Sequence, residues 1–279
     1  MYFTALRGHY KYNALRASTY TFSLNNTINE ISTNPLMAFS WAFKEYKNSN
    51  KIYKIDYEKG KKLQEKLFSI YSITSNYKKE QPHIMLNIME SFGMNVLAFS
   101  DKNNDFLGSL KQHFKDDFLF SRILSRSNST IFSFGNLIFL NPNSNLYQGI
   151  YKKKILSYTP IKIYKDAGYK VVFAYSGNAS WYDLGNYLKN QGVDLIIDEN
   201  TILKKYPNSK NTKHKYGIKD EYLYKEIFDL LLNSKEKIFL ISLTISNHRP
   251  YVHKSDKNLI DFKNIDNKLF EKIHIQNNK

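Results

Sequence analysis

The sequence has no cysteine, little proline or glycine, and no long apolar run. The absence of cysteine from 279 residues excludes disulfide bonds, thiolate zinc sites and cysteine nucleophiles. Six prolines and 11 glycines exclude a collagen-like or Pro/Gly-rich low-complexity chain. No stretch is apolar over about 18 residues, as a bilayer-spanning helix requires, and residues 1–16 lack the apolar segment of a signal peptide. The chain as written is therefore expected in the cytoplasm.

Acidic residues are outnumbered, with 25 Asp and Glu against 41 Lys and Arg, which gives a formal charge of +16. Such a field favours anionic partners such as phosphate headgroups, nucleic acid or anionic polymers. The excess is almost all lysine, scattered through a sequence rich in Asn, Ile and Tyr, so a solvated basic surface explains it equally well. No nucleic-acid recognition motif is present, and a nucleic-acid partner is not expected.

The order of apolar patterns predicts an α/β fold. Residues 1–80 are predicted to form a helical lead-in that packs on a core at 81–252, and 253–279 are predicted to be a polar tail. Alternating strands and helices in the core favour a mainly parallel sheet flanked by helices, in which ligands bind beyond the carboxyl ends of the strands. The predicted strands are 83–89, 118–124, 171–175, 193–197 and 238–244, and the predicted helices are 37–46, 61–71, 104–114, 130–140, 160–167, 181–190 and 220–232.

Two segments that follow predicted strands carry oxygen-rich side chains. Glu90, at the end of the first strand, is well placed to bind a divalent cation, although a surface or capping glutamate fits the pattern equally well. The segment SRSNST at 125–130 precedes a predicted helix. A hydroxyl at a helix N-terminus can contact a phosphoryl group or act as a nucleophile, and it can also be an ordinary N-cap.

Two further loops at the same predicted rim carry groups suited to a phosphorylated ligand. Asn178 and Trp181 follow the strand VVFAY, and the indole is placed to form a wall against a sugar or glycerol moiety, or to fill the core. His248 and Arg249 follow the strand IFLISLT, and both side chains can donate hydrogen bonds to an oxyanion. A histidine in a loop is more often structural or simply exposed.

Taken in order, these segments resemble the lipoteichoic acid synthase-like phosphoglycerol transferases, which are sulfatase-like members of the alkaline phosphatase superfamily. LNIMESFG is similar to the family's metal-binding segment, SNHRPY to its histidine segment, and GYKVVFAYSGN with the following tryptophan to a third segment. GIKDE and the opening Arg-Gly pair also match, so the resemblance covers roughly residues 5–252. It implies a sulfatase-like α/β core.

The resemblance also implies roles for individual residues. Glu90 and a hydroxyl would bind a divalent metal, first Mn²⁺, with Mg²⁺ or Zn²⁺ as alternatives. Thr130 would be the nucleophile that attacks a phospholipid headgroup donor, with Ser127 and Ser129 as alternatives, before transfer to an envelope glycan or lipid. The implied substrate-binding residues are Trp181, Asn178, His248 and Arg249. The parent family is anchored in the inner membrane, with this domain outside the cytoplasm.

Three departures qualify the expected activity. Ser176 stands where the family has histidine, Asp183 stands where it has arginine, and no Gly-Asp-His segment supplies the later metal ligands. The chain is therefore expected to be truncated at both ends and inactive alone. One alternative is a non-catalytic remnant that binds anionic lipid or polymer through its lysines. Another is a phosphodiester or sulfate ester hydrolase of the same superfamily, although no Cys- or Ser-x-Pro-x-Arg segment supports an arylsulfatase.

Overall fold

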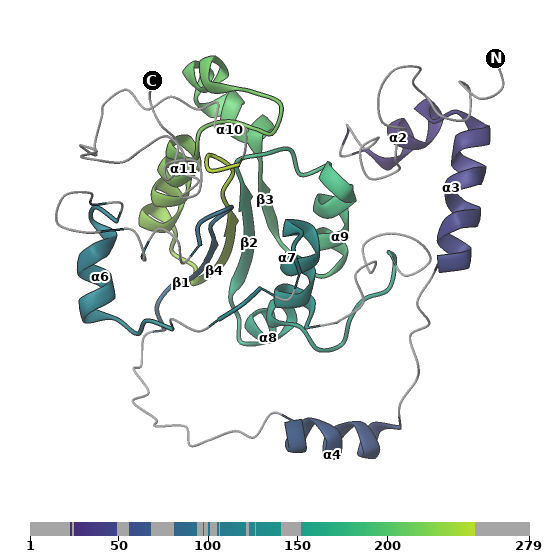
Figure 1. Cartoon of the computed structure of the whole chain (residues 1–279), viewed down its shortest axis with the longest axis horizontal. Helices are drawn as coiled ribbons and strands as arrows, with labels where there is room; N and C mark the ends of the chain where they lie inside the picture. The colour runs from purple at the N-terminus through teal and green to yellow at the C-terminus, as the bar shows by residue number, and fades with distance from the viewer. Residues whose placement is uncertain are drawn as a thin grey trace.

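A computed structural model describes the sheet and most of the helices of this chain (Figure 1). The described helices before the first strand are α2 (Asn26–Ser32), α3 (Pro35–Asn48) and α4 (Tyr57–Leu67). The helices predicted at 37–46 and 61–71 correspond to α3 and α4. The described residues are 23, 25–48, 56–67, 81–93, 97, 100, 105, 107–120, 123–125, 127–140 and 152–248.

Four parallel strands form the sheet within the described residues, which confirms the predicted parallel sheet and four of its five predicted strands. They are β1 (Ile84–Ile88), β2 (Lys170–Tyr175), β3 (Leu195–Ile197) and β4 (Ile238–Leu243), in the spatial order β1-β4-β2-β3. Leu243 pairs with both Ile88 and Tyr175, so β1, β4 and β2 end at the same level. Because these strands are parallel, the loops that follow them leave from one rim of the sheet.

Helices cover both faces of the sheet (Figure 1). One face packs against α7 (Thr130–Phe139), α8 (Pro160–Asp166) and α9 (Leu184–Asn190), and the other against α10 (Glu199–Lys205) and α11 (Asp220–Asn233). Each face of the sheet has its own hydrophobic core. Alternate residues of β2 belong to these two cores, because successive side chains of a strand point to opposite faces. Val171 and Phe173 lie in the first core, and Val172 and Ala174 in the second.

Local sequence signals explain where the helices begin and end. Thr159 caps α8 by accepting a hydrogen bond from the Lys162 amide at 3.1 Å, and Pro160 occupies the first turn, where no amide donor is needed. Asp198 caps α10 in the same way, accepting from the amides of Asn200 and Thr201 at 3.1 Å. Helix α10 was not predicted from the sequence, although Asp198 is a strong N-cap residue.

The strand predicted at 118–124 is wrong. The described residues of this segment form no strand, and Phe118 and Leu124 are 96% and 94% exposed. A short apolar run does not by itself distinguish a strand from an irregular segment. The helix predicted at 104–114 lies instead at α6 (Leu110–Asp116), after a turn in which Asp105 accepts hydrogen bonds from the Leu107 and Gly108 amides.

The turn before α11 packs tightly against the loop that follows β2. Gly217 has a φ of +156°, and a Cβ atom added there would lie 2.4 Å from the Ser176 carbonyl oxygen and 2.8 Å from the Gly177 Cα. The next amide, that of Ile218, donates to the same Ser176 oxygen at 3.0 Å. The close approach that makes this hydrogen bond therefore leaves no room for a side chain at position 217.

We expect Gly217→Ala to lower the free energy of unfolding by about 2–4 kcal/mol, because the new methyl group meets backbone that cannot move aside. Gly168→Ala is the matched control: Gly168 also has a positive φ, +79°, but its nearest neighbour would lie 3.5 Å away. That change should cost only about 1 kcal/mol, the strain of a left-handed residue. Urea unfolding of both variants tests the difference, and equal losses would show that the steric argument is wrong.

Candidate functional site

The half-buried carboxylate of Glu90 lies at the rim where β1 and β4 end. The chain turns sharply there, since Ser91 has a φ of +54°. The Glu90 amide donates to Thr244 Oγ1 at 2.9 Å, and the Thr244 amide donates to the Ile88 carbonyl oxygen at 3.1 Å. This pair of bonds continues the contact between β1 and β4 past their last paired residues and fixes the backbone of Glu90.

Thr130, the first residue of α7, meets Glu90 across 40 residues of sequence. Its Oγ1 donates a hydrogen bond to Glu90 Oε2 at 2.8 Å, and Ser91 Oγ donates to Glu90 Oε1 at 3.1 Å. The side chains that the sequence placed separately thus come together. The segment before Thr130 reaches the rim as a loop and not, as predicted, directly from a strand.

The two alternative hydroxyls make different contacts. Ser127 Oγ accepts from the Ser129 amide at 3.3 Å, and the Ser127 carbonyl oxygen accepts from the hydroxyls of Ser125 and Ser133, both at 2.9 Å. Ser129 occupies the N-cap of α7, where its side chain makes no capping hydrogen bond. Among the three candidates, Thr130 is the residue whose hydroxyl the structure places on Glu90.

A cleft of about 170 Å³ opens beside Glu90 and Thr130. It brings together five of the six side chains singled out from the sequence, and the sixth, Arg249, lies outside the described residues. Sequence reasoning missed the rest of the lining. The cleft is lined by Glu90, Thr130, Asn178, Trp181 and His248, and by Tyr175, Lys215, Tyr216, Leu243, Thr244 and Ile245.

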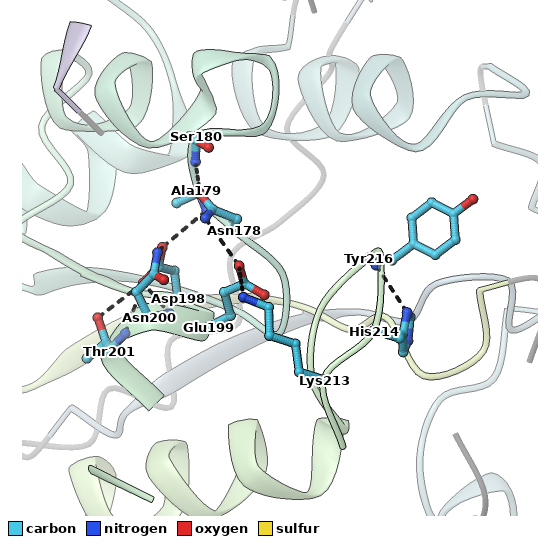
Figure 2. A network of polar contacts seen from close by, with 10 residues as sticks. All are labelled: Asn178, Ala179, Ser180, Asp198, Glu199, Asn200, Thr201, Lys213, His214 and Tyr216. Atoms are coloured by element: carbon cyan, nitrogen blue, oxygen red, sulfur yellow. Dashed lines mark hydrogen bonds and ion pairs between the residues drawn. The ribbon is translucent and has the colours of Figure 1, made fainter. Parts of the chain in front are cut away.

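Trp181 and Asn178 come from the loop that follows β2. The indole lies 6.1 Å from the Tyr175 ring, and Tyr182 and Asp183 have positive φ values, so the helix predicted at 181–190 is a short 3-10 turn followed by α9. Asn178 Oδ1 accepts from the Ser180 amide at 2.8 Å, and its Nδ2 donates to Glu199 Oε1 at 3.2 Å (Figure 2). Both polar groups of the Asn178 side chain, the oxygen and the nitrogen, thus have hydrogen-bond partners in the protein.

Glu199 links two walls of the cleft. Its side chain is almost fully buried, and Oε1 contacts both Asn178 and Lys213 Nζ, the latter at 3.4 Å (Figure 2). Lys213 begins the loop that carries Lys215 and Tyr216. The Tyr216 ring lies 4.0 Å from the His248 ring, with an interplanar angle of 33°, so the loop before α11 and the loop after β4 form one wall.

Asp220 fixes the loop after β4. Its carboxylate accepts hydrogen bonds from the Ile245 amide at 2.8 Å, the Ser246 amide at 2.9 Å and Ser176 Oγ at 2.5 Å. Ser176 is fully buried in this contact, so the residue that stands in place of the family's histidine is part of the scaffold. The other departure, Asp183, accepts a hydrogen bond from Asn186 Nδ2 at 2.7 Å.

Burial shapes the protonation of two groups near the cleft. Burial, with smaller contributions from Glu90, Glu199 and Asp220, raises the pKa of Tyr175 well above its ordinary value of 10, so its phenol remains a hydrogen-bond donor. Burial, followed by the nearby His248, lowers the pKa of His214 below 6.5, and Asp220 opposes this. His214 Nδ1 accepts a hydrogen bond from the Tyr216 amide at 3.1 Å, which requires that nitrogen to be unprotonated (Figure 2).

Two of the described residues have side chains that could bind a divalent metal ion. Glu90 and Thr130 place a carboxylate and a hydroxyl oxygen side by side, the donor types that Mg²⁺ and Mn²⁺ prefer. Within the described ranges, however, no group of three His, Cys, Asp or Glu side chains is arranged to hold a metal ion. A catalytic site usually needs about three protein ligands, so these two residues fit such an ion without completing its coordination.

Among the described residues, no helix has the length and apolar character to cross a membrane.

We expect the free energy of unfolding to decrease as the pH is lowered past the ordinary pKa of histidine. Protonation of His214 should account for part of this decrease. Because the folded state holds the pKa of His214 below its value in the unfolded chain, the unfolded chain binds more protons as the pH drops. The contribution of His214 is therefore present above about pH 6.5 and is lost as the pH falls through the lowered pKa. His214→Asn keeps an acceptor for the Tyr216 amide but does not titrate. Denaturant unfolding at about six pH values between 7.5 and 5 gives the free energy of unfolding as a function of pH. This free energy should depend less on pH in the variant than in the wild type, and an equal dependence would contradict the role of His214.

Comparisons with known proteins identify the fold. The protein-family model described as Sulfatase matches residues 82–267, and no curated protein matches. A solved protein of the alkaline phosphatase superfamily from Vibrio parahaemolyticus has a TM-score of 0.55 and 18% identity, over 76% of this chain and 54% of that chain. The lipoteichoic acid synthase LtaP from Listeria monocytogenes has a TM-score of 0.53 and 18% identity, over 69% of this chain and 48% of that chain.

A third solved structure, the phosphoglycerol transferase GacH from Streptococcus pyogenes in complex with sn-glycerol-1-phosphate, has a TM-score of 0.45 and 18% identity, over 70% of this chain and 53% of that chain. This chain spans about half the length of the solved proteins that it matches. The family match covers most of the described sheet and the whole cleft. The chain therefore belongs to the sulfatase family and has the α/β fold of the alkaline phosphatase superfamily.

Proposed function

We propose that this chain carries the nucleophile and one metal ligand of a divalent-metal-dependent phosphoglycerol-type transferase. The observation that carries the proposal is the hydrogen bond from Thr130 Oγ1 to Glu90 Oε2, 2.8 Å long, at the mouth of a cleft beyond the carboxyl ends of parallel strands. A hydroxyl activated by a neighbouring base or metal is a suitable nucleophile for a phosphodiester. The solved relative LtaP, a lipoteichoic acid synthase, supports the choice of substrate class.

The proposed reaction has two steps, each a substitution at phosphorus. In the first, Thr130 Oγ1 loses its proton to solvent and forms a bond to the phosphorus of a phospholipid headgroup, and the bond from phosphorus to the diacylglycerol oxygen breaks. Solvent supplies the proton for that oxygen. In the second, the hydroxyl oxygen of an envelope glycan or lipid attacks phosphorus and loses its proton to solvent, while Thr130 Oγ1 leaves and recovers a proton from solvent. The net result is transfer of the phosphoglycerol group.

The other walls of the cleft suit a glycerol phosphate. Trp181 presents an indole to the carbon skeleton, Asn178 lies next to it, and His248 offers an imidazole to a phosphate oxygen. A divalent cation bound by Glu90 and Thr130 would favour the ionised hydroxyl and neutralise charge that develops on the phosphate. We propose Mn²⁺ for this ion, because carboxylate and hydroxyl oxygens suit Mn²⁺ and Mg²⁺ better than Zn²⁺.

A second candidate is a non-catalytic protein that binds anionic lipid or polymer. The observation that favours it is the absence, within the described residues, of a third metal-ligating side chain beside Glu90 and Thr130. The formal charge of +16 supplies the attraction that such binding needs. The same cleft would then bind a phosphate headgroup without turning it over.

We expect Thr130→Ala to abolish any transfer from phosphatidylglycerol vesicles that the wild-type chain carries out in the presence of Mn²⁺, with a loss of about 10³-fold or more, because the attacking oxygen is removed. Turnover by the wild type would also overturn the sequence-based expectation that the chain is inactive alone. Released diacylglycerol measures the reaction, and mass spectrometry locates the phosphoglycerol adduct. Ser127→Ala and Ser129→Ala are matched controls that should keep the activity, and Thr130→Ser should keep part of it.

An adduct on either serine would move the nucleophile to that residue and contradict our assignment. Diacylglycerol release with water as the acceptor would indicate a hydrolase. A wild-type protein that binds the vesicles but releases no diacylglycerol, with or without Mn²⁺, would favour the non-catalytic candidate.

We expect Glu90→Gln to weaken Mn²⁺ binding by about 10-fold or more, because a neutral amide replaces the charged oxygen donor. Electron paramagnetic resonance of free Mn²⁺ gives the affinity without any need for turnover. Glu221→Gln is the control, since Glu221 is an exposed carboxylate of α11 that does not line the cleft. Equal effects of the two substitutions would show that the metal does not bind at Glu90.

A further inference from the structure

Side chains of opposite charge, Glu90 and Lys215, line the cleft. Glu90 and Thr130 form one side, and the loop 213–217 with His248 forms another. Lys215 is the lysine that lines the cleft among the described residues, and its Nζ lies 5.4 Å from the centre of the Tyr216 ring. Within the part of the chain that the structure describes, no carboxylate lies within ion-pair distance of this ammonium group. Its charge is therefore available to a ligand.

The backbone around Lys215 is fixed on both sides. Before it, Lys213 pairs with buried Glu199 (Figure 2). The His214 amide donates to the Gly217 carbonyl oxygen at 2.9 Å. After it, the Tyr216 amide donates to His214 Nδ1, and Gly217 packs against the Ser176 backbone. A long flexible side chain on a fixed backbone can reach an anion in the cleft at a small cost in backbone entropy.

When no metal ion is bound at Glu90, an anion beside this carboxylate needs a cation from some other residue. A phosphate brought next to a carboxylate is repelled, and the repulsion grows as water is excluded from the cleft. Two positions where the resemblance predicts basic residues do not supply that charge. Ser176 is buried against Asp220, and Asp183 is acidic and bonded to Asn186.

We infer that Lys215 is a substrate-binding residue that contacts the phosphate group of the ligand in the cleft. This inference rests on the proposed function, since it names a specificity-determining residue for the same cleft. Lys215 selects anionic over neutral ligands, and its ammonium group lies near the ring of Tyr216, which itself packs against His248. A lysine recognises phosphate as a point charge, so the shared chemistry is that of a phosphomonoester or phosphodiester, free or in a lipid headgroup.

The test is the affinity of the full chain for inorganic phosphate and for glycerol phosphate, measured by isothermal titration calorimetry at two salt concentrations. Lys215→Gln should weaken both affinities by about 5- to 20-fold at low salt, as expected for loss of a charge-assisted hydrogen bond, and should reduce their dependence on salt. Lys215→Arg should restore most of the affinity. Vesicles of phosphatidylglycerol, compared with neutral vesicles, show whether the lipid headgroup is bound in the same way.

Lys210→Gln is the matched control. It removes one positive charge from the same stretch of chain, but Lys210 is exposed and does not line the cleft, so its phosphate affinity should stay within about 2-fold of the wild type. Equal losses of phosphate affinity in the two variants would show that the effect comes from the net charge of the protein and not from a contact of Lys215, and would overturn the inference. So would an unchanged affinity in Lys215→Gln, or a wild-type protein that binds neither probe.

The outcome is separable from that of the proposed transferase. Phosphate binding through Lys215 should persist in Thr130→Ala, because the two residues act on different walls of the cleft. A protein in which Lys215→Gln loses phosphate while Thr130 proves irrelevant to turnover would support the binding residue and contradict the nucleophile. The reverse pattern would support the nucleophile and overturn the role of Lys215.

Discussion

Three parallel strands end at the same level in the sheet, and the cleft depends on this alignment. Leu243 pairs with Ile88 on one side and with Tyr175 on the other, so the loops that follow β1, β4 and β2 start at one level. The hydrogen bond from the Glu90 amide to Thr244 Oγ1 extends that alignment beyond the last paired residues, by two residues after β1 and one residue after β4. A shift of β1 by one residue would turn its side chains to the opposite face and separate Glu90 from Thr130.

Buried polar groups then fix the loops that the strands bring together. Asp220 accepts three hydrogen bonds from the end of β4 and from Ser176, and Glu199 joins Asn178 to the loop 213–217. Each such bond contributes only about 1–3 kcal/mol, but leaving one partner unsatisfied in a buried site costs a similar amount. The networks therefore favour a single arrangement of the loops, and Ser176 belongs to this scaffold in place of a residue that would face the ligand.

Much of the fold was predictable because the strands of a parallel sheet are recognisable as short apolar runs. The segments HIMLNIM, VVFAY and IFLISLT gave β1, β2 and β4, and with them the position of Glu90 at the rim. The apolar residues that are described between 118 and 124 are exposed, so composition alone was misleading there. Helix α10 was overlooked although Asp198 supplies a capping signal, because its seven residues are too few to show a clear period.

The cleft itself was predictable only in part. Strand ends pointed to Glu90, Asn178, Trp181 and His248. The sequence favoured Thr130 over Ser127 and Ser129 only through the family resemblance, and the contact of Thr130 with Glu90 adds a geometric difference that the sequence does not show. Lys215 and Tyr216 lie on a loop that does not follow a strand. The Lys213–Glu199 ion pair and the packing of Gly217 against the Ser176 backbone hold this loop in place, and both contacts join residues that are far apart in the sequence. Their one local signal was the glycine that begins the segment GIKDE.

Anomalous diffraction from crystals of the full chain grown with Mn²⁺ tests the central claim most directly, because it locates the ion without any assumption about turnover. The account predicts one ordered Mn²⁺ with Glu90 and Thr130 Oγ1 among its ligands, at the rim where β1 and β4 end. An ordered Mn²⁺ bound elsewhere, with Thr130 still hydrogen-bonded to Glu90, would contradict it.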